Sequence, residues 1–124
     1  MTITLCALND LIPGRGAAVL LRDGHQLALF RHSDNSVDAL DNHDPATGAN
    51  VLSRGLLGDK DGNRVVVSPL LKHSYRLDDG TCLEGPWTVA VHSVTVVQGT
   101  VCLNTEPLEA RKAQEPTCQT VSLH

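Results

Sequence analysis

Short apolar runs joined by glycine turns constrain the fold of this chain more than any other feature. "AAVLLRDGHQLALFRH" contains two apolar runs joined through Asp23-Gly24, which is a strong local signal for a β-hairpin. "SVDAL" alternates apolar and polar residues, and "GDKDGNRVVV" is a charged turn that leads into an apolar strand. "WTVAVHSVTVVQGTVCLN" alternates, turns at Gln98-Gly99 and returns. The pattern predicts an all-β fold, built as a small antiparallel barrel or sandwich.

The β pattern ends near residue 103, where the composition changes. At 124 residues the chain fits one domain, and it can bury an aliphatic core without disulfides or metals. "NTEPLEARKAQEPTCQTVSLH" holds few apolar residues. We therefore expect a β domain over residues 1–103 and a flexible C-terminal tail over residues 104–124. "EPLEARKAQ" could add one short helix there, because Pro107 suits a first helical position.

Charge and hydropathy exclude several classes of function. A net charge of −4 opposes binding to nucleic acids or anionic membranes, which need a basic surface. No apolar run approaches the length of a membrane span, and "MTITLCALNDL" lacks the features of a secretory signal, so we expect a cytoplasmic protein. The four cysteines lie far apart without a C-x-x-C pair, which favours free thiols over a disulfide or zinc site: Cys6, Cys82, Cys102 and Cys118.

Two polar loops carry the functional signal. "DNHDPATGANVLSRGLL" spans residues 41–57, and "VVVSPLLKHSYRLDDG" spans residues 65–80. Together they resemble the cluster-binding loops of the Rieske iron–sulfur family, in which Cys-x-His precedes a Leu-Ser-x-Gly turn and Cys-Pro-x-His-Gly precedes an aromatic residue. Here "LSRG" matches the turn, Pro69 is kept, Tyr75 takes the aromatic position and Gly80 closes the hairpin. The resemblance implies a Rieske-like β fold.

The same resemblance places four other residues at the ligand positions of the cluster. They are Asn42 and Asp44 in the first loop, and Ser68 and Leu71 in the second. A Rieske cluster needs two thiolates on one iron and two imidazoles on the other. Leucine has no lone pair to donate, and an alcohol is a poor replacement for thiolate on soft iron. The resemblance thus implies Rieske-type loops without a cofactor or metal in this chain.

A narrower resemblance rests on an ordered set of motifs. "NHDP", "VLSRG", "SPLLK" and "YRLDDGTC" are similar in order and spacing to the small subunit of NAD(P)H-dependent assimilatory nitrite reductase, over roughly residues 3–103. The large subunit of that enzyme carries flavin, an iron–sulfur cluster and sirohaem, and it reduces nitrite to ammonium. The resemblance implies a subunit without catalytic residues of its own, which docks on the large subunit and stabilises or tunes it.

The tips of the two loops are the candidate contact surface for that partner. Lys72, Arg76 and Arg54 form a basic set that is either a solvated rim or a docking patch. Leu70 could anchor the interface, whereas we expect Leu71 to fold inward and fill the space of the missing cluster. The predicted interface comprises Asn42, His43, Asp44, Arg54, Ser68, Pro69, Leu70, Leu71, Lys72, His73 and Arg76.

The sequence also allows alternatives to a cluster-free subunit. His43 and His73 lie next to the vacated ligand positions, so they could hold a single metal ion with Asp44 and Cys82. The chain would then be a Rieske-type electron-transfer ferredoxin with a non-standard ligand set. A stand-alone binding module for another oxidoreductase is a third hypothesis. The other histidines suggest no such role: we expect His25 to be solvated in its hairpin turn, and His92, within an alternating strand, to face water or a polar neighbour.

Overall fold

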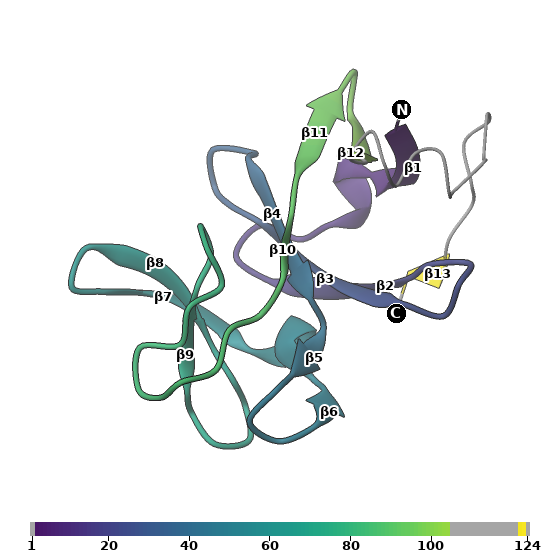
Figure 1. The fold of residues 1–124 in the computed structure, drawn as a ribbon. Helices are drawn as coiled ribbons and strands as arrows, with labels where there is room; N and C mark the ends of the chain where they lie inside the picture. The colour runs from purple at the N-terminus through teal and green to yellow at the C-terminus, as the bar shows by residue number, and fades with distance from the viewer. Residues whose placement is uncertain (1, 105–121, 124) are drawn as a thin grey trace.

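The protein is an assembly of short strands. A computed structural model describes residues 2–104 and 122–123 (Figure 1). Apart from two 3₁₀ turns, η1 (Leu8–Asp10) and η2 (Leu52–Arg54), the regular elements of this part are strands, which confirms the predicted all-β class. The strands are β1 (Thr2–Ala7), β2 (Gly16–Leu20), β3 (Gln26–Arg31), β4 (Val37–Asp41), β5 (His43–Asp44), β6 (Ala49–Asn50), β7 (Leu56–Lys60), β8 (Asn63–Val67), β9 (Ser74–Arg76), β10 (Val91–His92), β11 (Val94–Val97), β12 (Thr100–Asn104) and β13 (Ser122–Leu123).

The described strands form four antiparallel sheets rather than one closed barrel. The largest has the order β10-β4-β3-β2-β13, and a second has the order β1-β12-β11. β7-β8-β9 form a third sheet and β5-β6 a short fourth one. In Figure 1 the first two sheets make the upper right of the molecule, and the other two lie below and to the left. The smaller pair of sheets contains the two loops singled out in the sequence.

Turn chemistry sets the strand pairing as predicted. β2 and β3 pair across the Asp23-Gly24 turn, where Gly24 has φ of 90°. β11 and β12 pair across Gln98 and Gly99, with φ values of 50° and 76°. Positive φ at both central residues is the geometry of the tight hairpin turns that match strand twist. The turn between β7 and β8 has the same geometry, so the charged segment there is also a hairpin.

β3 lies between two hydrophobic cores. Leu27 and Leu29 pack into a core with β1 and β12, whereas Ala28 and Phe30 pack into a second core with residues of β8 and β9. Successive side chains of a strand point to opposite faces, so one strand serves both cores. The second core packs the β7-β8-β9 sheet against the large sheet, and it includes Leu52 of η2, within the first loop, so it helps to position both loops.

The predicted C-terminal tail falls mostly outside the described residues, as does the short helix predicted there. Of residues 105–124, the structure describes β13 alone, which pairs antiparallel with β2. Within the described residues, no helix has the length and apolar character needed to cross a membrane.

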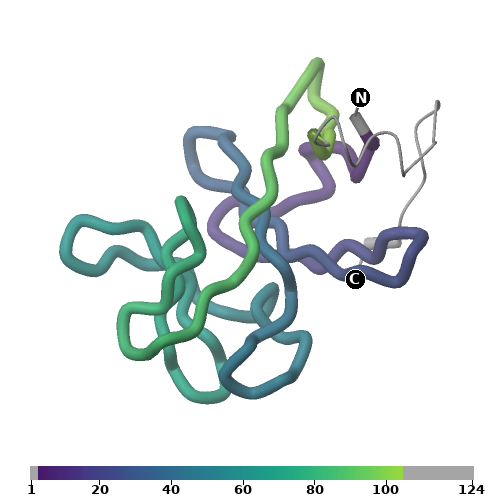
Figure 2. Tube along the Cα trace, viewed as in Figure 1, coloured from purple at the N-terminus to yellow at the C-terminus, as the bar shows by residue number. Residues whose placement is uncertain are grey.

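The chain path brings the two loops to the same end of the molecule. Figure 2 shows the segment after β4 and the segment after β8 turning at the lower end, beside each other. A hydrogen bond between the side chains of Ser68 and Asp44 joins them directly. Residues 24 positions apart in sequence are therefore neighbours at the site.

Candidate functional site

A buried hydrogen-bond network joins the two loops. The Asp44 carboxylate accepts a hydrogen bond from Ser68 Oγ at 2.5 Å and another from the Tyr75 hydroxyl at 2.6 Å. The Ala46 backbone N–H donates to the same carboxylate at 3.0 Å. Asp44, Ser68 and Tyr75 are each 0 % exposed. We call these three residues the loop network. It bonds two of the predicted ligand positions to each other, and this pairing could not be read from the sequence.

The Asp44 carboxylate is held in its charged form. Burial opposes ionisation, but the hydrogen bonds from Ser68 and Tyr75 outweigh it and lower the pKa of Asp44 below its ordinary value. Burial, together with the neighbouring Asp44 carboxylate, raises the pKa of Tyr75, so its hydroxyl remains a donor. No ion pair to Asp44 is present in the described part of the chain. Hydrogen bonds rather than a cation therefore stabilise this buried charge.

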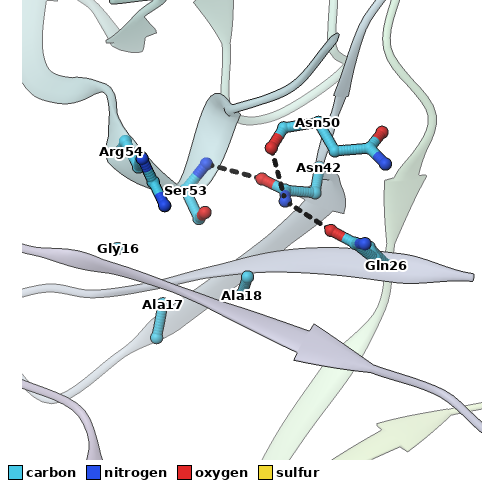
Figure 3. A pocket seen from close by; sticks show the side chains of 8 residues that line it. All are labelled: Gly16, Ala17, Ala18, Gln26, Asn42, Asn50, Ser53 and Arg54. Carbon is cyan, nitrogen blue, oxygen red and sulfur yellow. Dashed lines mark hydrogen bonds between the residues drawn. The ribbon is translucent and has the colours of Figure 1, made fainter. Parts of the chain in front are cut away.

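The buried side chain of Asn42 holds the first loop in place through hydrogen bonds. Its Oδ1 accepts a hydrogen bond from the Ser53 backbone N–H at 2.7 Å, and its Nδ2 donates to Gln26 Oε1 at 3.0 Å (Figure 3). Nδ2 also donates to the Asn50 carbonyl oxygen at 3.2 Å. These residues line one side of a polar pocket of about 270 Å³, with Arg54 at its rim. Because Asn42 is 1 % exposed and its amide is paired, it positions the loop rather than offering a free ligand.

The second loop presents its apolar residues to solvent. Leu70 is 53 % exposed and Leu71 is 55 % exposed. The prediction that Leu71 folds inward was wrong, because the polar loop network occupies the space between the loops. Pro69 is half-buried beside them. Lys72 follows with φ of 60°, a left-handed conformation that glycine adopts more easily and that matches the glycine of the Rieske motif.

Of the three basic residues predicted at the loop tips, only two lack an ion-pair partner among the described residues. Arg76 pairs with Asp78 at 2.9 Å and with Asp79 at 3.7 Å, so its charge is largely compensated locally. Arg54 and Lys72 are exposed, and neither has an ion-pair partner among the described residues. These two residues carry the net positive charge at the loop tips.

The two histidines of the loops do not converge on a metal site. His43 is exposed, with its Nδ1 3.3 Å from Asn50 Oδ1. The His73 ring packs on Trp87 with a centroid separation of 4.8 Å. Neither histidine lies in a group of three potential metal ligands within residues 2–104. The alternative metal site built from His43, His73, Asp44 and Cys82 therefore lacks the necessary geometry.

A different cluster of potential metal ligands was missed by the sequence analysis. His25 and His92 both contact the Asp41 carboxylate. The His25 side chain is 45 % exposed, as predicted for a solvated turn, and it also contacts Asp41. The polar neighbour predicted for His92 is confirmed. The two histidines lie 67 positions apart, in segments whose spacing carries no motif, so only the paired strands reveal the cluster.

The loop geometry agrees with the comparisons to known proteins. The sequence profile described as "Rieske-like [2Fe-2S] domain" matches residues 2–104. The nitrite reductase (NADH) small subunit of Salmonella typhimurium is 42 % identical over 102 residues, covering 80 % of this chain and 93 % of that protein. The chain belongs to the nitrite reductase small-subunit family of Rieske-like domains.

Two further relatives support this family assignment. The crystal structure of an NADH-dependent nitrite reductase small subunit from Mycobacterium tuberculosis has a TM-score of 0.78 at 48 % identity, covering 83 % of this chain and 93 % of that one. The NAD(P)H nitrite reductase large subunit of Klebsiella oxytoca is 44 % identical over 108 residues, covering 86 % of this chain and 11 % of that protein. A region similar to this chain thus occurs within that large subunit.

The side chains at the four predicted ligand positions do not fit a [2Fe-2S] cluster. Such a cluster requires Cys and His donors from both loops. Here Asp44 and Ser68 bond each other, Asn42 is saturated by protein partners, and Leu71 points to solvent without a donor atom. The loops are joined by hydrogen bonds at the place where the Rieske motif would join them through iron.

Proposed function

We propose that this chain is the non-catalytic small subunit of a cytoplasmic NAD(P)H-dependent nitrite reductase. It carries no cluster, and it docks on the large subunit, which reduces nitrite to ammonium in nitrate assimilation. The observation that carries the proposal is the 2.5 Å hydrogen bond between Ser68 and Asp44. It closes the two ligand loops onto each other and leaves the outer surface of the loops to act on a partner.

The absence of a cluster follows from coordination chemistry. The loop network supplies one carboxylate and two hydroxyl groups, which are hard oxygen donors that suit cluster iron poorly. The carboxylate is already the acceptor of three hydrogen bonds. Binding iron there would break a buried network that is otherwise satisfied, at a considerable cost in free energy.

The docking surface is formed by exposed residues around the loop network. Leu70 and Leu71 project from the second loop, and Leu56, 72 % exposed, lies at its base because it pairs with Val67 of β8. Exposed leucines next to polar residues resemble the apolar centre and polar rim of a protein interface. We call Arg54, Leu56, Leu70, Leu71 and Lys72 the loop-tip surface. His43, Pro69, His73 and Arg76 border it, while Asn42, Asp44 and Ser68 support it from inside.

The likeness to the Klebsiella oxytoca large subunit supports this partner. In that protein a domain similar to this chain is part of the large-subunit polypeptide itself. Two domains joined in one chain have a high effective concentration for each other, so even a modest interface keeps them together. For the separate chain, the loop-tip surface must supply the affinity that the covalent link supplies there.

Co-purification with the large subunit tests the docking surface. We expect Leu71→Asp to weaken complex formation by about tenfold or more, since it places a charge at an apolar contact. The matched control is Val97→Asp on β11, because Val97 is 53 % exposed, close to the 55 % of Leu71, and β11 lies in the sheet with β1 and β12, away from the two loops in Figure 1. Equal binding by the two variants would contradict docking through the loop tips.

Metal content and charge supply independent tests. Purified protein should contain no stoichiometric iron and show no visible absorption of a cluster; iron at two atoms per chain would disprove the cluster-free proposal. Lys72→Glu should slow association with the large subunit, most strongly at low salt, because rim charges act mainly on the encounter. If this chain does not bind the large subunit under gentle conditions, the subunit proposal fails.

A further inference from the structure

Three side chains with metal-binding atoms converge on the largest sheet, away from the loop network. Asp41 Oδ1 lies 2.7 Å from His25 Nε2 and 2.6 Å from His92 Nε2. The three ligand atoms lie within 4.8 Å of one another. The His25 and His92 rings meet edge to face, with centroids 5.8 Å apart. One carboxylate oxygen is thus shared by two imidazoles that approach it from different strands.

The backbone holds this cluster in place. Asp41 is the last residue of β4, the strand between β3 and β10 in the large sheet. His25 directly precedes β3, and His92 pairs with Ala39 on the other side of β4. Since the Asp41 N–H also bonds the Ala90 carbonyl oxygen at 2.9 Å, three adjacent backbone segments fix the three Cα positions. A ligand bound here would find a preformed frame, which lowers the entropy cost of binding.

The electrostatics favour a cation. The Asp41 carboxylate supplies a negative charge beside two imidazoles, and each ring nitrogen can donate a hydrogen bond or bind a metal according to its tautomer. The side chains of His25, Asp41 and His92 are 45 %, 23 % and 28 % exposed, respectively. The cluster is therefore reachable from solvent, and an ion held there would keep at least one coordination position open.

We propose that His25, Asp41 and His92 form a binding site for a divalent transition metal ion of the zinc class. Two imidazole nitrogens and a carboxylate oxygen are a donor set that such ions prefer. Metal–ligand bonds of about 2.0–2.2 Å place the ligand atoms of a tetrahedral ion about 3.3 Å apart. Side-chain rotations of about 1 Å would widen the two short contacts to Asp41 and bring the imidazoles closer, with the backbone unchanged. This site is independent of docking by the loop-tip surface.

Titration of the full-length, untagged protein tests the site. Zn²⁺ binding is measured by calorimetry, and Co²⁺ serves as a probe because its visible spectrum reports tetrahedral coordination by nitrogen and oxygen. We expect one Zn²⁺ per chain and an upward shift in Tm with added Zn²⁺, because a ligand that binds only the folded state stabilises it. His25→Ala and His92→Gln should each weaken binding by about tenfold or more.

The chain offers a matched control. His32 directly follows β3, and its Nε2 lies 2.6 Å from Oδ2 of Asp38 on β4, but within the described residues no third ligand joins them. His32→Ala should therefore leave the Zn²⁺ affinity and the Tm shift unchanged. Wild-type affinity in His25→Ala, with the fold verified by circular dichroism, would overturn the site. So would loss of affinity in His32→Ala equal to that in His92→Gln, or a Co²⁺ spectrum that shows only the hydrated ion.

Discussion

Replacing Asp44 by alanine should destabilise the protein strongly. The substitution removes the acceptor of the Ser68 and Tyr75 hydroxyls, and both donors are then buried without a partner. Each buried orphan donor costs about 1–3 kcal/mol, so the expected loss for the two donors is about 2–6 kcal/mol. That loss is a large part of the total stability of a domain, which is typically about 5–15 kcal/mol. The loop network would thus be a main structural link between the two loops.

Urea denaturation followed by circular dichroism measures this loss. Asp59→Ala is the matched control, because Asp59 is an exposed carboxylate on β7 and its removal should cost about 0.5 kcal/mol or less. Tyr75→Phe keeps the ring and removes one hydrogen bond, so its effect should lie between those of the two aspartate variants. If Asp44→Ala costs no more than Asp59→Ala, the loop network contributes nothing to stability and the argument for it is refuted.

Three further outcomes follow from the same geometry. The pKa of the Asp44 carboxylate is lowered in the folded state, so its contribution to stability is fully present above its unfolded pKa of about 3.9. That contribution is lost as the pH falls through the folded pKa. The stability of Asp44→Asn should therefore fall less steeply with decreasing pH than that of the wild type, as measured by acid denaturation. Gly80→Ala should lower the free energy of unfolding, measured by thermal denaturation, by about 3 kcal/mol or more, because a Cβ would collide with the Val89 carbonyl oxygen. The control Gly24→Ala also lies at positive φ but in open space, so it should lower that free energy by only about 1 kcal/mol. Lys72→Gly should raise the free energy of unfolding by about 0.5 kcal/mol, since it relieves a left-handed backbone, and a decrease instead would show that the lysine side chain stabilises the loop.

Local features of the fold could be predicted because short-range chemistry decides them. Asp23-Gly24 and Gln98-Gly99 demand tight hairpins, and the alternation of apolar residues assigns each strand two faces. The loop motifs, with Asp44 and Ser68 in place of cluster ligands, were also visible in the sequence. What these residues do instead was not, because a hydrogen bond between positions 44 and 68 depends on how two sheets pack.

The outward position of Leu71 shows the same limit. From the sequence, a leucine at a vacated ligand position should fill the empty space, since burial of an apolar side chain is favourable. In the structure, the polar loop network takes that space and satisfies its own hydrogen bonds, so the leucine remains outside. Sequence alone does not show that Tyr75 donates a hydrogen bond to Asp44, because the two residues lie in different sheets, in β9 and β5.

The amino-acid sequence by itself therefore determined the strand pattern, the turns and the absence of cluster-type donors at the four ligand positions, since each follows from residue chemistry or from neighbours along the chain. Tertiary structure alone decided that Asp44, Ser68 and Tyr75 form one network and that His25, Asp41 and His92 meet on one sheet. The physical reason is that antiparallel pairing and sheet packing bring together residues whose separation in sequence carries no periodic signal.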